Sequence, residues 1–171
     1  VSMHTNMDNA KGGVNFKMAE KLGLQKVEFL APRESYTCGT KEYKAGDGVI
    51  ASLPAAVSKR EFMEHVKEVF RLKSLRVNNA SPKTIKRVAL CGGNGASFIP
   101  QAMEKGADVF ITGEIGYHRF FGYDKDILLL EIGHYESEQY TVELLRDIVT
   151  KLAPSLRVCK AETNINPIIY L

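Results

Sequence analysis

Apolar and polar positions follow two periods in the second half of the chain. Near-continuous apolar runs over residues 87–91, 108–112 and 127–132 are typical of β-strands buried on both faces. Helical spacing follows the first and third runs, over about 97–105 and about 136–152. Strands that alternate with helices favour a parallel sheet with right-handed crossovers. The pattern predicts an α/β fold with a mostly parallel sheet and flanking helices.

The expected helix near 136–152 is amphipathic. Its apolar face consists of Val142, Leu145, Val149 and Leu152. Pro154 ends it, and residues 156–159 are expected to form a last strand. A shorter helical piece is expected at 117–121, before the third strand.

The first third of the chain shows less regular signals. A turn at 11–13 precedes a helix with an apolar face, which Gly23 stops. That face consists of Val14, Met18 and Leu22. Residues 27–30 resemble a short strand, and 39–53 are expected to be extended, with a turn at 46–48.

A capping box starts the next helix. Ser58 and Glu61 have the spacing in which the hydroxyl and carboxylate each reach a backbone N–H. An apolar stripe of Phe62, Val66 and Phe70 continues the helix. We divide the chain into residues 1–53, the remnant of a first lobe with connecting strands, and residues 54–171, an α/β lobe.

Glycines and polar residues come directly after the three predicted strands. Gly92-Gly93 follows the first strand, Gly113-Glu114 the second and Gly133-His134 the third. In open parallel sheets, ligands bind outside the carboxyl ends of the strands. We therefore expect these residues to share one rim and to form the functional site.

Two segments pair an imidazole with a carboxylate four residues away. On a helix, His134 and Glu138 lie about one turn apart on the same side, as metal ligands or as an N-terminal helix contact. His4 and Asp8 precede the glycine turn. Asp8 fits either a cap for the following helix or turn, or a carboxylate that bridges two cations.

Other rim residues leave alternatives open. Glu114 fits a general base or a helix cap. His118 fits a proton shuttle, a residue that orients a ligand, or a buried hydrogen-bonded histidine. The glycine loop at 92–95 suits either phosphate binding by its N–H groups or close packing of strand against helix. Cys91 ends an apolar strand and is expected to be an inert core thiol.

Composition narrows the class of protein. Apolar residues make up 44% and charged residues 25% of 171 residues, as in ordinary globular domains. The 3 cysteines have no disulfide-like spacing, which favours a reducing, cytoplasmic location. No apolar run is long enough for a membrane helix, and no signal peptide is visible at Val1.

Residues 67–87 contain seven basic side chains and one acidic one. Such a stretch is a solvated face, or a patch that attracts anionic substrates or nucleic acid. Few aromatic residues interrupt it, so nucleic acid is the weaker partner hypothesis.

Five segments together resemble the Nif-three-like dinuclear metal-centre family, whose members are often labelled GTP cyclohydrolase I type 2 homologs. They are His4-Thr-Asn-Met-Asp8 with Gly12-Gly13-Val14-Asn15, residues 91–97, 106–113 and 133–138, and the closing 166–170. The resemblance implies a two-lobed α/β fold, two divalent metals (Zn, Mn, Fe or Mg) and a homohexamer. It places metal ligands at Asp8, His134 and Glu138, with His4 and His118 as neighbours.

One family feature is missing from the sequence. The family's first lobe contributes an adjacent His-His pair, and these 171 residues contain none. We expect most of that lobe, with two histidine ligands, to precede Val1. Three ligands are too few for two metals, so we expect this chain alone to bind metal weakly.

Two function hypotheses follow. The first is a metal-dependent hydrolase, a cyclohydrolase or phosphoesterase acting on a small anionic or nucleotide-like substrate. In it, Asp8 bridges the metals, His134 and Glu138 hold them, and Glu114 or His118 moves protons. The second is a metal-stabilised hexameric scaffold that binds regulatory partners without catalysis.

Overall fold

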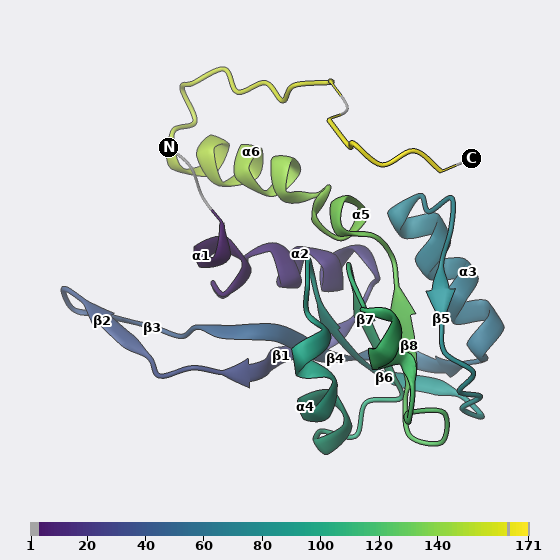
Figure 1. Cartoon of the computed structure of the whole chain (residues 1–171). Helices are drawn as coiled ribbons and strands as arrows, with labels where there is room; N and C mark the ends of the chain where they lie inside the picture. Colours follow the sequence, from purple (N-terminus) through teal and green to yellow (C-terminus); the bar gives the residue numbers. More distant parts are fainter. Residues whose placement is uncertain (1–3, 164, 171) are drawn as a thin grey trace.

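A computed structural model describes residues 4–163 and 165–170 of the chain (Figure 1). Its first half contains α1 (Thr5–Asp8), α2 (Val14–Lys21), β1 (Gln25–Pro32), β2 (Tyr36–Cys38), β3 (Lys41–Tyr43), β4 (Gly46–Val57) and α3 (Lys59–Phe70). Its second half contains β5 (Arg76–Val77), β6 (Ile85–Cys91), β7 (Val109–Thr112), β8 (Leu128–Glu131), α4 (Ile99–Glu104), α5 (His134–Glu138), α6 (Thr141–Leu152) and the 3₁₀ helices η1 (Ala96–Phe98) and η2 (Tyr117–Phe120).

Six strands form one mixed sheet in the order β1-β4-β6-β7-β8-β5. The predicted α/β class is confirmed, and β6, β7 and β8 are parallel. The sheet is mixed rather than mostly parallel, because β1–β4, β4–β6 and β5–β8 are antiparallel. Strand β1 connects to β4 through the β2–β3 hairpin, while α3 lies between β4 and β5 in the chain. Strands from both sides of the boundary expected at residue 53 belong to this sheet, and β4 spans it.

Side chains alternate across the central strands and build two cores. In β7, Val109 and Ile111 face one core, while Phe110 faces the other. Helices α2 and α3 cover the first core and α4 covers the second (Figure 1). Both faces of the parallel strands are therefore buried, as their unbroken apolar runs predict.

The prediction of a turn at residues 46–48 is wrong. Those residues begin β4, and the chain reverses earlier, in the β2–β3 hairpin that projects from the sheet (Figure 1). Gly48 has a positive φ of 56°, and a Cβ there would lie 2.7 Å from the carbonyl oxygen of Leu90. The glycine therefore serves close approach of β4 to β6 rather than a reversal.

The expected long helix at 136–152 is two helices, α5 and α6. The helix is interrupted at residues 139–140, where two side chains form hydrogen bonds with the end of α3. Gln139 donates from Nε2 to the carbonyl oxygens of Phe70 and Glu136, and Tyr140 donates to that of Val69. At Ser58, the hydroxyl accepts the Glu61 N–H at 3.2 Å, as the capping box predicts.

The apolar face of α6 is largely exposed, with Val142 at 49%, Val149 at 40% and Leu152 at 79%. The strand expected at 156–159 is wrong: within the described residues this stretch pairs with no strand, and Leu156 is exposed. Across residues 4–163 and 165–170, every helix falls short of the length and apolar character needed to cross a bilayer.

Candidate metal centre

The rim predicted from the sequence exists. Strand register places Cys91 beside Thr112 and Thr112 beside Glu131, so the three parallel strands end at one level. The loops that follow contact each other: the Glu114 N–H donates to the carbonyl oxygen of Gly93, and the Gly133 N–H to that of Gly113. The rim is thus a compact, hydrogen-bonded platform.

His134 is the first residue of α5, and carboxylates lie near both of its ring nitrogens. Glu114 Oε1 is 2.8 Å from Nδ1, and Glu138 Oε1 is 3.5 Å from Nε2. The helix brings Glu138 back over the ring, as the four-residue spacing predicts. When Nδ1 carries the proton and donates to Glu114, Nε2 is unprotonated and its lone pair is available to a metal ion.

Gly93 supplies the space in front of this pair. A Cβ at Gly93 would lie 2.7 Å from Glu138 Oε1 and 3.5 Å from His134 Nε2, and φ there is +62°. Only glycine combines this backbone conformation with the close approach. The loop therefore leaves the nitrogen and oxygen of the pair accessible from one side.

Asp8 reaches the same region from the far end of the chain. It ends α1 and lines a hollow of about 160 Å³, which Glu138 and His4 also line. Burial raises the pKa of Asp8, and charges on His4 and His134 oppose that rise. Gly13, not Asp8, occupies the N-cap position of α2, so Asp8 does not cap that helix.

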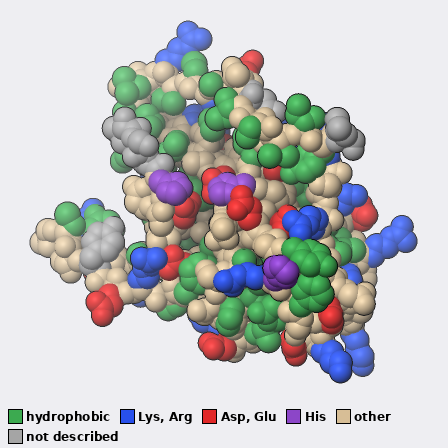
Figure 2. Space-filling view, viewed as in Figure 1, with side chains coloured by type: hydrophobic (Ala, Val, Ile, Leu, Met, Phe, Trp, Pro, Cys, Tyr) green, Lys and Arg blue, Asp and Glu red, His purple; other side chains and the backbone are tan. Residues whose placement is uncertain are grey.

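The same electrostatic pattern holds at Glu138. Burial raises its pKa, the charge on His134 lowers it, and Asp8 raises it again. In the described part of the chain, no lysine or arginine is among the groups that shift either carboxylate. Figure 2 shows histidine and acidic side chains gathered at a hollow between α1 and α5.

The other predicted residues are placed differently. His4 is exposed, lines the hollow and contacts Thr5. His118 is also exposed, not buried, and its ring packs edge-on against Tyr117 in η2. No contact between His118 and Asp8, His134 or Glu138 is present among the described residues. Glu114 does not cap η2, whose N-cap is Gly116.

The glycine loop at 92–95 packs rather than presenting N–H groups to an anion. Three of its N–H groups are used internally: Gly92 donates to Asn15 Oδ1, Gly93 to Ser137 Oγ and Gly95 to Thr112 Oγ1. Nearby, burial raises the pKa of Cys91 to about 12, which confirms the inert thiol. The packing interpretation of the loop is the one that the contacts support.

Sequence reasoning missed Asn15, Thr112 and Ser137, the buried polar residues that hold the rim loops. Asn and Ser are common at helix starts and Thr at strand ends, so their types gave no signal. The usable signal was apolar context: Asn15 lies one residue after Val14 at the start of a core-facing helix.

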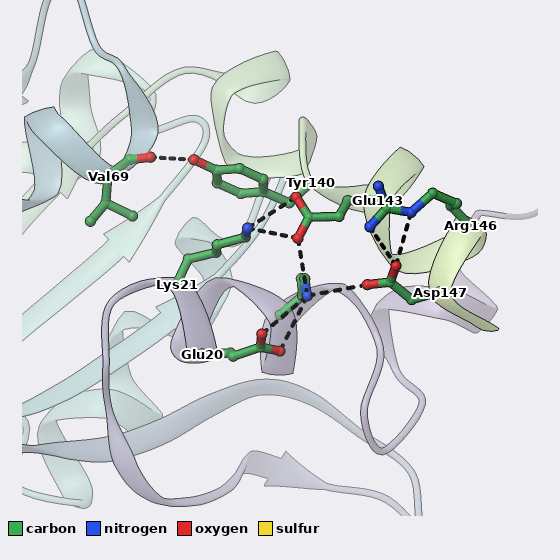
Figure 3. A network of polar contacts seen from close by, with 8 residues as sticks. Glu20, Lys21, Val69, Tyr140, Glu143, Arg146 and Asp147 are labelled. Atoms are coloured by element: carbon green, nitrogen blue, oxygen red, sulfur yellow. Dashed lines mark hydrogen bonds and ion pairs between the residues drawn. The ribbon is translucent and has the colours of Figure 1, made fainter. Parts of the chain in front are cut away.

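Charged side chains connect α2 to α6 beside the hollow (Figure 3). Lys21 Nζ is 2.7 Å from Glu143 Oε1 and lies 4.6 Å from the ring centroid of Tyr140. Lys17, 8% exposed, lies 3.1 Å from Glu20 and 3.3 Å from Glu143. Hydrogen bonds from the two lysines lower the pKa of Glu143. These contacts hold α6, which follows Glu138, against α2, which follows Asp8.

Fold and rim together define an α/β protein with a mixed six-stranded sheet and a cluster of imidazole and carboxylate groups at the carboxyl ends of its parallel strands. The profile of the family described as Duf34/NIF3 (NGG1p interacting factor 3) matches residues 1–167. The chain belongs to this family, which confirms the resemblance found from the motifs.

Relatives carry the label "GTP cyclohydrolase 1 type 2 homolog". One from Clostridium acetobutylicum is 30% identical over 97% of this chain and 62% of its own length. One from Streptococcus pneumoniae is 36% identical over 77% of the chain and 48% of its own length. The chain thus spans about three fifths or less of these relatives.

Solved structures show the same fold. The Staphylococcus aureus protein SA1388 superposes with a TM-score of 0.87 at 25% identity, over 100% of this chain and 69% of its own. A Bacillus cereus protein related to NIF3 gives a TM-score of 0.83 at 22% identity, over 98% of this chain and 72% of its own.

Proposed function

We propose that Asp8, His134 and Glu138 contribute to a site for two divalent metal ions, Zn, Mn, Fe or Mg. The observation that carries the proposal is the 3.5 Å separation of His134 Nε2 and Glu138 Oε1. Two ligands of one tetrahedral zinc ion, each about 2.1 Å from the metal, lie about 3.4 Å apart. The pair already has the spacing of two ligands that share an ion.

Three further features of the residues fit a metal. Glu114 lies within hydrogen-bonding distance of Nδ1 of His134, as does the carboxylate that orients a metal-bound histidine in many metal sites. Burial disfavours the charges of Asp8 and Glu138, and no lysine or arginine side chain offsets them among the described residues. A divalent cation would supply the missing positive charge.

The described residues do not complete the site. They contain no group of three or more histidine, cysteine, aspartate or glutamate side chains drawn together closely enough to hold a metal. Two metals require additional ligands, for which the family resemblance suggests two histidines outside these 171 residues. Tests therefore use the full-length protein, meaning this chain with any sequence that flanks it in its gene.

Thermal unfolding with and without metal tests the site. Because burial raises the pKa of Glu138, the folded state binds its proton more tightly than the unfolded state. This contribution favours folding at low pH and is lost as pH rises through the raised pKa. At pH 7, Glu138→Gln is therefore expected to raise the Tm of the metal-free protein by about 2 °C.

With metal bound, the wild type should have a higher Tm than Glu138→Gln. Mn²⁺ at 100 times its Kd should stabilise the wild type by about 2.7 kcal/mol and Glu138→Gln by far less. Glu61→Gln, on the exposed first turn of α3, is the matched control and should respond to metal as the wild type does. Equal stabilisation of all three proteins would remove Glu138 from the site.

For the reaction, we propose metal-dependent hydrolysis of a small anionic or nucleotide-like substrate, a cyclohydrolase or phosphoesterase reaction. Bound metals would supply an activated water and would neutralise charge that develops on a phosphoryl or ring oxygen. Glu114 holds the His134 ring, and Asp8 and Glu138 face the hollow. The side chains of His134 and Glu138 are 48% and 33% exposed, so a substrate can reach them. This openness favours catalysis over a closed scaffold site.

Turnover of GTP and of phosphoesters, measured with Mn²⁺ or Zn²⁺, tests the reaction. Asp8→Ala should reduce kcat at least about 100-fold, as expected when a metal bridge is removed. Metal binding without any turnover above the Asp8→Ala protein would favour the scaffold hypothesis. For the whole protein, the resemblance also favours a cytoplasmic location and a homohexamer. Analytical ultracentrifugation of the full-length protein would measure the number of subunits.

A further inference from the structure

One buried amide connects the two halves of the candidate metal centre. Asn15 lies in the first turn of α2 and is 2% exposed. Its Nδ2 donates to the carbonyl oxygen of Asp8 at 3.0 Å, and its Oδ1 accepts the Gly92 N–H at 2.8 Å. A carbonyl only accepts and an N–H only donates, so this orientation alone satisfies both partners.

The connection continues to His134. Gly93 donates its N–H to Ser137 Oγ at 2.9 Å, and the same hydroxyl donates to the carbonyl oxygen of His134 at 2.7 Å. Ser137 is fully buried. Four hydrogen bonds, joined through the Gly92–Gly93 peptide, therefore connect the Asp8 backbone through Asn15 and Ser137 to the His134 backbone.

Two other hydrogen-bonded attachments of the Asp8 segment lead to β4. The Gly46 N–H donates to the Asn9 carbonyl oxygen, and Ala10 forms a bridge with Ala45. Both contacts tie the segment to the start of β4, whereas the Asn15 bond ties it to the loop beneath His134 and Glu138. In that loop, a Cβ added to Gly93 would lie 2.7 Å from Glu138 Oε1.

We propose that Asn15 is a positioning residue, which ties the Asp8 segment to the glycine loop so that Asp8 lines the same hollow as Glu138, where the cations would bind. The inference rests on the proposed metal site and adds to it a residue that contacts no metal. Buried hydrogen-bonded amides are rigid, since breaking either bond leaves a buried polar group without a partner. Asn15 therefore transmits the position of the glycine loop to α1.

Asn78 provides a matched control. It is 6% exposed, and its amide also bridges two backbone groups, donating to the Ile127 carbonyl oxygen at 3.0 Å and accepting the Leu129 N–H at 2.9 Å. Its partners lie at β8, at the opposite end from the rim. Asn15→Ala and Asn78→Ala thus each remove one pair of equivalent side-chain hydrogen bonds. The Asn15 pair lies at the site, and the Asn78 pair lies away from it.

The experiment titrates Mn²⁺ into both variants of the full-length protein by calorimetry. Both should lose similar thermal stability, but only Asn15→Ala should weaken metal binding, by about 10-fold, as for residues that support metal ligands. Asn15→Asp, which keeps an oxygen for Gly92 and loses the donor to Asp8, should also bind metal more weakly. Equal metal affinity in Asn15→Ala and Asn78→Ala would overturn the proposal.

Amide hydrogen exchange separates this inference from the proposed function. In the metal-free protein, Asn15→Ala should speed exchange at the amide of Met7 in α1 and at that of Asn9, its C-cap, and Asn78→Ala should not. A wild type that binds no metal would refute the metal site alone, and exchange would still decide whether Asn15 holds α1. Unchanged α1 exchange in Asn15→Ala would refute its positioning role.

Discussion

The His134→Ala protein is expected to bind Mn²⁺ or Zn²⁺ at least about 100-fold more weakly than the wild type, more than the loss from an outer ligand partner. His134 Nε2 is the nitrogen donor that this chain brings to Glu138. Removing it takes away an imidazole nitrogen, a ligand that suits zinc better than carboxylate oxygens alone. Calorimetric titration of the full-length protein measures the change directly.

Two variants set the scale for that loss. Glu114→Gln leaves the ring in place and weakens only its hydrogen bond to Nδ1, so a loss of about 10-fold is expected. His65→Ala removes a histidine of α3 whose Nε2 lies 3.3 Å from the Leu22 carbonyl oxygen, and metal affinity should not change. If His134→Ala resembled His65→Ala, His134 would not be a ligand.

The Gly13→Ala substitution should destabilise the protein by about 3 kcal/mol, at the upper end of the cost of overpacking. A Cβ at Gly13 would lie 1.9 Å from the carbonyl oxygen of Met7, an atom of the α1 backbone. The φ of −81° at Gly13 suits alanine, so the cost is steric rather than conformational. Relief of the clash requires α1 to move, which displaces Asp8.

Urea unfolding measures this cost, and Gly116→Ala is its control. Gly116 has a φ of −59° and no atom within 4 Å of the position that a Cβ would take. Alanine there should leave stability unchanged or raise it by about 0.5 kcal/mol, through a less disordered unfolded chain. Similar stabilities for the two variants would show that α1 is not packed against Gly13.

The parallel strands could be predicted because burial on both faces produces unbroken apolar runs, as in 108–112. The break between α5 and α6 could not, because it depends on Gln139 and Tyr140 binding carbonyl groups of α3, about seventy residues earlier. The glycines at 46 and 48 led to a wrong prediction of a turn for a related reason. Its positive φ at Gly48 serves contact with Leu90, which sequence alone does not reveal.

The candidate site divides in the same way. His134 and Glu138 could be paired from local spacing, since one helical turn brings them together. That Asp8 lines the same hollow as Glu138 was expected from the family resemblance, and we attribute it to the Asn15 connection to Gly92, which spans 77 residues. The role of Glu114 also depends on a contact across the rim, with His134 twenty residues later.

Anomalous diffraction from crystals of the full-length protein grown with Zn²⁺ or Mn²⁺ is the most direct test of the shared cation pocket. The account predicts one peak about 2.1 Å from His134 Nε2 and a Glu138 oxygen, and a second about 3.5–4 Å from the first, with Asp8 between them. Ordered metal peaks elsewhere in the crystal, with none within about 4 Å of His134 Nε2, would contradict it.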